Sequence, residues 1–543
     1  MAPIFVGSND DNSRVRSDRV GFAISTANPG SASEGDAYYN SSDSQLNIYD
    51  GSAWASAGAG GNSVELVASG TLSDGQTVII TSDGKVAGVT TVGAALTSSS
   101  ATDINSTETA WISAAYDENT ERVLVVYQDT GNSDYGTAVV GTVNSDNTIT
   151  FGTPTVFQSN QILRTSAIYH PGIKKVVFSY GYSSGMYLRT AIIDASNNTV
   201  TFGTAVSASI TSMTGGDTQI LVYDDSAEKL IYIYAGRNPN LRGVYARVAS
   251  ITDAGAITFP SSEVRLSASG NDPYEEATSA AYAGSGKTVV AWVDKDDSYN
   301  AYYSTITVSG TTITATAQAT GPFWTQWPTM VYHAEQQKLV LSGGGGSTGR
   351  IAYRTGTISG TTVTWGNTIF AGPYRTGGET AYLFSRYDSL EKKIVYVYRQ
   401  NSPSRWEAAE ATLVGVSSVV LDNTIIIGGL PNSSYVYQDY SSSLKGNVVV
   451  IGAGTSGRAS IVETSRVSTN LTANNFLGFS DAAYSDGATA KIQIAGSVDD
   501  AQSGLTTAKK HYVQNDGSLS TTAGDPSVEA GVGISTTQII ILG

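Results

Sequence analysis

Between Trp111 and Val414 the chain repeats one pattern of apolar and polar positions six times. Each copy has a short apolar strand that ends in tyrosine, a polar turn with a basic residue, and a second strand rich in Val, Ile and Tyr. The anchoring tyrosines are Tyr116, Tyr169, Tyr223, Tyr282, Tyr332 and Tyr387, at steps of 53, 54, 59, 50 and 55 residues. A step near 50 residues is typical of a propeller, a solenoid or another array.

Each copy continues with a third strand, a tight turn and a fourth strand, written NTITFGTP in the first copy and NTVTFGTA in the second. Four short strands joined by turns predict one antiparallel sheet. Six such sheets around an axis predict an all-β protein with a six-bladed β-propeller, flanked by small N-terminal and C-terminal β modules. A single blade would not fold alone, because ordering each residue costs about 1–2 kcal/mol and its edges would stay unpaired.

The sixth copy has no FGTP-like fourth strand in register, so the sequence leaves two ways to complete that blade. In the first, the segment Gly88–Leu96 from before the first copy acts as a latch. In the second, Val416–Leu421 supplies the strand directly. The predicted domains are 1–61, an N-terminal hairpin module and linker; 62–415, the propeller, with 62–100 as lead-in and candidate closing strand; 416–466, a β linker domain; and 467–543, a C-terminal β module.

Composition supports this architecture and limits the partners. Charged residues make up only 14% of the 543 positions, the net charge is −16, and no stretch has a helical apolar period. An acidic protein does not offer the basic clusters that displace counterions from nucleic acid. No apolar run is long enough for a membrane span, and the start of the chain lacks signal-peptide features, which predicts synthesis in a cytoplasm. The absence of cysteine excludes disulfides and thiolate metal sites.

Both ends of the chain resemble modules of tailed-phage virion proteins. The stretch Gly35–Trp54 (GDAYYNSSDSQLNIYDGSAW) is similar to a hairpin of phage fibre proteins, although an ordinary hairpin with a DG turn fits it too. Residues 467–543 resemble a C-terminal β-module of phage fibres, especially marine ones, through Ser485–Ala488, Gly504–Thr507, Lys510–Gln514 and Asp516–Thr522. The resemblance implies a virion component that contacts other virion proteins and forms homo-oligomers, as fibre proteins of this kind, which are often trimeric, do. It carries no catalytic residues.

Loop chemistry predicts that one face of the propeller binds ligand. If the strands of a blade are A to D from the axis outward, the D–A and B–C loops share a face. These loops contain aromatic side chains for stacking on sugar rings and polar groups for sugar hydroxyls. The candidate ligand-binding residues are Phe323, Trp324, Trp327, Tyr374, Arg375, Trp406, Arg405 and Tyr299. The alternative for Trp324 and Trp327 is packing between blades as core.

The remaining candidates favour structural roles. His170 and His333, with the basic residues at 122, 175, 229, 338 and 393, fall in A–B turns that we expect to face solvent. The acidic turn with Asp294, Asp296 and Asp297 is either solvated or a calcium site. Glu275, Glu276 and Glu379 are glycosidase candidates by loop position alone, and the C–D turns lack the glycine of sialidase repeats. No catalytic triad, metal ligand set or cofactor site is predicted.

The sequence therefore predicts a non-enzymatic structural protein of a virion, a tail fibre or tail appendage that displays a propeller for recognition of host-surface glycan. One alternative is a capsid decoration or head-fibre protein with a purely structural role. Another is a propeller enzyme, a depolymerase that cleaves host polysaccharide.

Overall fold

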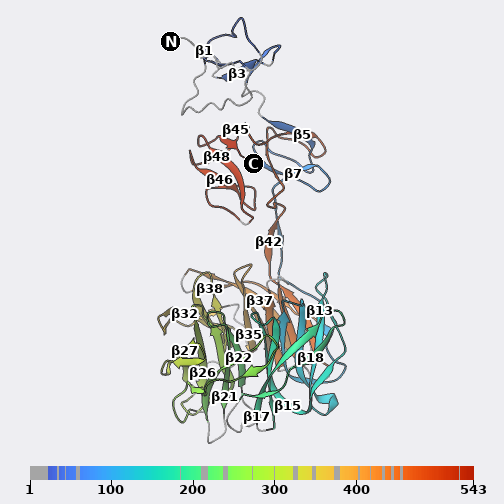
Figure 1. Ribbon diagram of the computed structural model, residues 1–543, viewed down its shortest axis with the longest axis vertical. Helices are drawn as coiled ribbons and strands as arrows, with labels where there is room; N and C mark the ends of the chain where they lie inside the picture. Colours follow the sequence, from blue (N-terminus) through green and yellow to red (C-terminus); the bar gives the residue numbers. More distant parts are fainter. Residues whose placement is uncertain are drawn as a thin grey trace. The chain divides into compact units, whose positions relative to one another are not determined.

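The computed structural model describes residues 23–33, 36–42, 45–49, 51–56, 62–183, 185–208, 218–236, 242–271, 273–298, 300–321, 328–344, 350–371, 380–401, 404–415, 418–430, 435–441, 446–452, 456–524 and 526–542. The chain forms two compact units, one of residues 1–94 with 467–543 and one of residues 95–466 (Figure 1). This division differs from the predicted boundaries, because 416–466 joins the propeller and 62–94 joins the C-terminal module.

The described part of residues 95–466 forms seven antiparallel blades in a ring. Their innermost strands are β11 (Thr109–Asp117), β15 (Thr155–His170), β20 (Thr218–Asp224), β25 (Pro273–Tyr282), β30 (Thr329–His333), β35 (Thr380–Asp388) and β39 (Tyr435–Ser441). Each of these strands contacts the next, and β39 also contacts β11, so the ring closes. The all-β propeller prediction is confirmed, but the ring has seven blades where the sequence predicted six.

The other strands of the ring lie outside these seven. Blade 1 has β12 (Arg122–Asp129), β13 (Tyr135–Val143) and β14 (Ile149–Phe151), with a 3-10 helix at Thr130–Asn132. Blade 2 has β16 (Lys175–Tyr182), β17 (Gly185–Asp194), β18 (Thr199–Phe202) and β19 (Val206–Ser207). Blade 3 has β21 (Lys229–Gly236), β22 (Gly243–Ile251), β23 (Ile257–Thr258) and β24 (Val264–Arg265). Blade 4 has β26 (Lys287–Asp294), β27 (Asn300–Ser309), β28 (Thr312–Ala315) and β29 (Ala319–Thr320).

Blade 5 has β31 (Lys338–Gly344), β32 (Ile351–Ser359), β33 (Thr362–Trp365) and β34 (Ile369–Ala371). Blade 6 has β36 (Lys393–Asn401), β37 (Ser404–Val414) and β38 (Ser418–Ile426). Blade 7 has β40 (Gly446–Gly452), β41 (Arg458–Glu463), β9 (Thr97–Ser98) and β10 (Thr102–Asp103). The described residues contain no helix that could span a membrane.

Strands in the middle of a blade are apolar on both faces because each face packs against a different neighbouring blade. On β12, Leu124 and Val126 join a core with blade 2, and Val123 and Val125 join a core with blade 7. Successive side chains of such a strand point to opposite faces of the sheet and therefore enter two different cores, instead of alternating between core and solvent. This explains why the second strand of each repeat is an unbroken apolar run.

Blade 7 does not show in the sequence repeat, because distant parts of the chain build it. Its strands β39, β40 and β41 come from residues 435–463, and its outer edge comes from β9 and β10 near residue 100. The predicted N-terminal latch exists, but Thr97–Asp103 forms it instead of Gly88–Leu96, and it closes blade 7 instead of blade 6. Blade 6 takes its outer strand, β38, from the segment that begins after Val414, close to the second alternative.

The first unit is assembled from both ends of the chain. One sheet has the order β5 (Ser63–Val67), β44 (Thr489–Gln493), β43 (Phe476–Ser480), β6 (Thr77–Ile80) and β7 (Val86–Gly88). A second has the order β45 (Val498–Asp499), β49 (Ile539–Ile541), β48 (Val528–Gly533), β46 (Lys510–Val513) and β47 (Leu519–Ser520). The strands β8 (Thr91–Ala94) and β42 (Arg466–Thr469) pair as a ribbon, and β1 (Ala23–Ser25), β2 (Ala37–Asn40), β3 (Gln45–Tyr49) and β4 (Trp54–Ser56) form a separate sheet.

The A–B turns hold neighbouring blades together. The residue after the anchoring tyrosine is buried and closes its own turn: Asp117, Asp224 and Asp388 each accept two backbone N–H bonds, and the Nδ1 of His170 and of His333 each accepts one. The ring of His170 packs edge-on against Tyr223 of the next blade, with centroids 4.7 Å apart. The prediction that these histidines face solvent is wrong, because they are 4% and 1% exposed.

Candidate ligand-binding site

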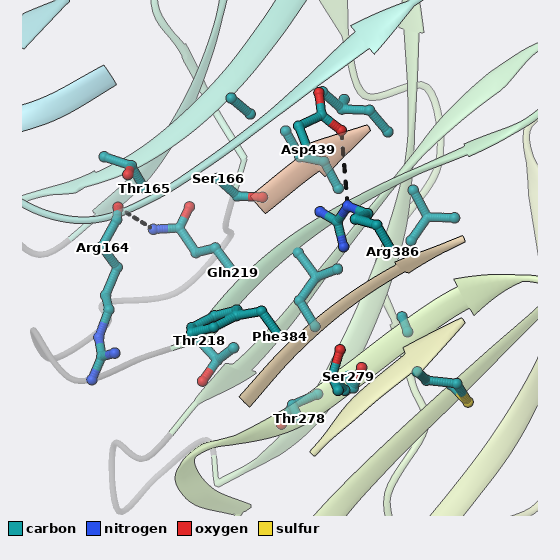
Figure 2. Close-up of a pocket in the computed structure, with 18 of the residues that line it drawn as sticks. Arg164, Thr165, Ser166, Thr218, Gln219, Thr278, Ser279, Phe384, Arg386 and Asp439 are labelled. Carbon is teal, nitrogen blue, oxygen red and sulfur yellow. Dashed lines mark hydrogen bonds and ion pairs between the residues drawn. The ribbon is translucent and has the colours of Figure 1, made fainter. Parts of the chain in front are cut away.

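A cavity of about 500 Å³ lies on the propeller axis, and all seven innermost strands contribute to its wall (Figure 2). Its size is in the range of small-molecule sites. Arg164, Thr218 and Thr278 stand four or five residues before the anchoring tyrosines of their strands, toward the D–A loops. Arg386, directly before Tyr387, and Asp439, which accepts the Tyr116 N–H, lie nearer the A–B turns. The end with Arg164 belongs to the face of the D–A and B–C loops, which is the face that the sequence predicted to bind ligand.

Three inner strands contain a bulge of unusual backbone conformation. Trp111, Arg164 and Tyr382 have φ angles of 47°, 39° and 50°, and the strand register shifts at each of these positions. A residue other than glycine in the left-handed region costs on the order of 1–3 kcal/mol and persists where its surroundings enforce it. Such bulges occur beside functional sites, where they redirect a side chain.

Side chains from the adjoining blades hold two of these bulges. The Thr165 hydroxyl donates to the Trp111 carbonyl oxygen at 2.5 Å, and the Gln219 amide donates to the Arg164 carbonyl oxygen at 3.1 Å. The hydroxyl of Tyr232 donates in turn to Gln219 Oε1 at 3.0 Å. The Arg164 guanidinium lies over the Trp111 indole, 4.1 Å from the ring centroid. These contacts fix an aromatic and cationic wall before any ligand arrives.

Hydroxyl groups on blades 3 and 4, which follow blade 2 in the ring order, continue the wall. Thr218 and Thr278 line the cavity, and neither Oγ1 has a hydrogen-bond partner among the described residues. Thr278 is only 7% exposed. Leaving a buried hydroxyl unsatisfied costs about 1–3 kcal/mol, so such a group is expected where a ligand or water completes it. Figure 2 shows both threonines on the side of the cavity where the Arg164 side chain lies.

An ion pair crosses between blades 6 and 7 deeper in the cavity. Arg386 Nε lies 3.8 Å from Asp439 Oδ1, and Asp439 Oδ2 accepts the backbone N–H of Tyr116 at 2.9 Å. Asp439 thus connects blade 7 to both of its neighbours at the point where the ring closes. Its carboxylate is the only one among the described residues that line the cavity.

Anchoring tyrosines line the part of the cavity toward the A–B turns. The hydroxyl of Tyr282 lies 2.7 Å from Ser226 Oγ and also donates to Asp225, both in the preceding blade. Burial raises the pKa of Tyr282, and the hydrogen bond to Asp225 adds to the rise. These contacts bind blade to blade, so the A–B end of the cavity is structural.

Most of the predicted ligand residues lie outside the described residues. These are Phe323, Trp324, Trp327, Tyr374, Arg375 and Tyr299, which stay predictions, as do Glu379 and the side chains of Glu275 and Glu276. Trp327 directly precedes Pro328, which lines the cavity. The predicted tryptophans therefore stand in the sequence segment directly before a residue that lines the cavity.

The structure corrects the prediction for Trp406. Its side chain is 1% exposed and packs in a core with Val397 of blade 6 and Val462 of blade 7. Strand β37 begins at Ser404, so Trp406 belongs to the sheet and not to a loop. Its neighbour Arg405 is half-exposed and binds the buried carboxylate of Glu407 at 2.6 Å. Neither residue lines the axial cavity.

The acidic turn of blade 4 is held by protein groups. Asp294 is buried and accepts the Asn271 amide, Asp296 pairs with Arg242 at 2.9 Å, and Asp297 accepts the Tyr302 hydroxyl. That last hydrogen bond raises the pKa of Tyr302 to about 12. Within the described part of the chain, no group of three or more acidic or histidine side chains is arranged to hold a metal ion.

A signal for the missed cavity residues was present in the sequence. Trp111, Arg164 and Tyr382 each stand five residues before an anchoring tyrosine, as do Thr218 and Trp327. Aligning the repeats on their tyrosines would have brought these positions into one column. Their function as a wall depends on the ring, which sequence alone does not show.

No protein-family model matches the sequence, and no curated protein matches it. Solved structures with a similar fold include a protein from Lactobacillus plantarum, with 15% identity, a TM-score of 0.43, and coverage of 61% of this chain and 88% of that one. The NanB sialidase of Streptococcus pneumoniae has 9% identity, a TM-score of 0.35, and coverage of 55% and 66%. The Aleuria aurantia lectin in complex with a fucoside has 9% identity, a TM-score of 0.36, and coverage of 59% and 98%. Likeness this low carries no conclusion about function.

Proposed function

We propose that the axial cavity is a carbohydrate-binding site and that the protein is a virion adhesin, a tail fibre or tail appendage that recognises host-surface glycan. The observation that carries the binding proposal is the cavity itself. A stacked Trp111–Arg164 wall and the buried, unpartnered hydroxyl of Thr278 line one cavity at the predicted ligand face. Aromatic faces and hydroxyls are the groups that a sugar ring and its hydroxyls require.

The virion part of the proposal rests on the resemblance of the two terminal modules to phage fibre proteins. The chain architecture is compatible with it, since the whole propeller is inserted as one continuous segment between residues 94 and 467 of the first unit. Such an insertion leaves the first unit to contact other virion proteins. We propose a homo-oligomer for this fibre, as its resemblance implies. Electron microscopy of particles labelled with antibody tests this, and absence of the chain from virions would refute it.

A glycan array with the full-length protein tests the binding proposal, and Thr278→Val is the matched variant. Because the Thr278 hydroxyl has no hydrogen-bond partner among the described residues, its removal should leave the melting temperature unchanged or raise it, while glycan binding weakens about tenfold. Thr305→Val is the control, since Thr305 is also buried with an unpartnered hydroxyl but does not line the cavity. If both variants bind glycan equally well, the axial cavity is not the glycan-binding site.

The depolymerase alternative requires two carboxylates across the site. Among the described residues that line the cavity only Asp439 has one, and it already bonds to Arg386 and to Tyr116 N–H. We therefore propose binding without cleavage. Incubation with host envelope polysaccharide decides between them, because released oligosaccharide indicates the enzyme and retention without release indicates the adhesin. Antibody labelling of heads instead of tails would favour the capsid decoration alternative.

A further inference from the structure

We infer that the axial site prefers a sugar with an acetamido group, and that Thr218 and Thr278 bind the amide of that group; this inference rests on the proposed carbohydrate site. It starts from the seam between blades 3 and 4, where the inner strands β20 and β25 lie side by side. Both threonines line the cavity, and the Oγ1 of each lacks a hydrogen-bond partner in the part of the chain that the structure describes.

The two hydroxyls belong to opposite sides of this seam. Successive side chains of a strand point to opposite faces of the sheet, and the strand register is continuous from each threonine to its anchoring tyrosine. Thr218 therefore shares a face with Ile220, and Thr278 shares a face with Ala280. Both Ile220 and Ala280 pack against the core between blades 3 and 4. Thr218 and Thr278 thus project into the same seam, one from each blade.

Apolar side chains follow the hydroxyls in the direction of the A–B turns. Ile220 and Ala280 stand two residues after the two threonines, line the cavity and are only partly buried. Each side of the seam therefore presents a hydroxyl first and an apolar surface next. A ligand group that matches this order carries polar atoms on two opposite sides and a small apolar tip.

An acetamido group has this arrangement. Its amide is planar and trans, so the N–H and the C=O point in opposite directions, and the methyl group lies at the end away from the sugar ring. One threonine can accept from the N–H and the other can donate to the C=O, because a hydroxyl is both donor and acceptor. The methyl group then contacts Ile220 and Ala280. A sugar hydroxyl at the same position has neither the second polar atom nor the methyl group.

The test measures binding of the full-length protein to matched sugars displayed on an array. The pairs are N-acetyl-D-glucosamine with D-glucose, N-acetyl-D-galactosamine with D-galactose, and N-acetyl-D-mannosamine with D-mannose. At least one acetamido sugar should bind about tenfold or more tightly than its partner, because it gains two hydrogen bonds and buries a methyl group.

Two substitutions that keep the side-chain shape locate this preference. Thr218→Val and Thr278→Val should each weaken binding of the acetamido sugar about tenfold and binding of its partner less, so each removes most of the preference. Thr305→Val is the control, because Thr305 is buried with an unpartnered hydroxyl but does not line the cavity, and it should leave the preference intact. The melting temperature of each variant shows that a lost preference is not lost folding.

The outcomes separate this inference from the proposed function. Equal binding of both members of every pair, or a preference that survives Thr218→Val and Thr278→Val, overturns the acetamido inference and leaves the carbohydrate site standing. Failure to bind any glycan on the array overturns the proposed function with it.

Discussion

In five of the six repeats, the residue after the anchoring tyrosine closes the A–B turn, with two different chemistries; in blade 4 this residue is Ala283. Aspartate does so through Oδ1 in blades 1, 3 and 6, and histidine does so through Nδ1 in blades 2 and 5. An Nδ1 that accepts a hydrogen bond must be unprotonated, and the His333 Nε2 contact with the Lys392 carbonyl oxygen at 3.1 Å places the ring proton there. Burial lowers the pKa of His170 and of His333, and the cause is loss of water around the charged ring.

The histidine turns predict a pH dependence of stability. A pKa that is lower in the folded protein than the ordinary 6.5 means that the unfolded chain binds more protons as pH falls. The stability that the neutral rings contribute is therefore complete above pH 6.5 and is lost as pH falls toward the folded pKa values.

The double variant His170→Asp/His333→Asp should remove this dependence, because aspartate already closes the equivalent turns. Urea unfolding between pH 7 and 5.5 measures it, with the unchanged protein as reference. His333→Ala should lose about 1 kcal/mol at pH 7, since the turn N–H loses its acceptor. A slope that is identical in the wild-type protein and the double variant would contradict the assignment.

At the scale of elements, closure of blade 7 joins residues that are hundreds of positions apart. Thr97 pairs with Glu463, and Ser98 pairs with Val462. The hydroxyls of Ser99 and Ser460 bond across the same seam, where Ser460 Oγ donates to the Ser99 carbonyl oxygen at 2.9 Å. Cα atoms of directly paired antiparallel residues lie about 4.5–5.5 Å apart, which is within the range that a disulfide spans.

The chain has no cysteine, so an engineered pair of cysteines tests this seam without competing thiols. Thr97→Cys with Glu463→Cys should form a disulfide on oxidation, because the two positions are direct partners. Closing a loop of this length should stabilise the propeller by about 4–5 kcal/mol if the seam opens on unfolding. Thermal unfolding with and without reductant measures the gain, and each single variant is a control. If no disulfide forms under oxidising conditions, the latch is misassigned.

The blades also differ in how they end. Blade 6 has one nine-residue outer strand, β38. The outer edge of each other described blade consists of two short strands or, in blade 1, of the short strand β14 and the first part of β15. Short outer strands limit pairing with other chains. The outer strands are interrupted at the FGTP-like segments of the sequence repeat. We infer that these segments limit pairing of the blade edges with other chains.

At the scale of the whole molecule, the first unit is closed by strands from both chain ends. Leu66 pairs with Ala490, and Thr77 pairs with Phe479, so residues 467–543 depend on residues 62–94. The ribbon of β8 and β42 lies where the chain leaves and re-enters this unit, and Thr90 O accepts the Asn470 N–H at 3.2 Å.

This arrangement predicts that the propeller can be excised. Replacing residues 95–465 by Asn-Gly should join β8 to β42 as a hairpin, because that pair favours the tight turn such strands need. The shortened chain should fold, with a cooperative thermal transition and β-type circular dichroism. Residues 467–543 alone should not fold, since β42, β43 and β44 would each lose a partner strand. A cooperative transition in that fragment would contradict the shared unit.

The sequence by itself determined the features that depend on neighbours along the chain: the strands, through alternating apolar positions, the turns after each anchoring tyrosine, and the blade as a unit of about 50 residues. Loop order within a blade fixes which loops lie together, so the sequence also predicted a ligand face on the side of the D–A and B–C loops, and ligand binding there stays a prediction. Trp406 was misplaced, because exposure depends on what packs against a strand and blade 7 was not recognised.

Only the tertiary structure decided the seventh blade, the shared first unit and the axial cavity. Each of these joins residues that the sequence separates, such as Thr97 with Glu463, or Trp111 with Arg164. Local patterns report on the preferences of a strand or turn, whereas a seam or a cavity wall arises from pairing energies between strands that meet only after the ring has closed. That is why the strands could be read from the chain, and why the residues that line the site could not.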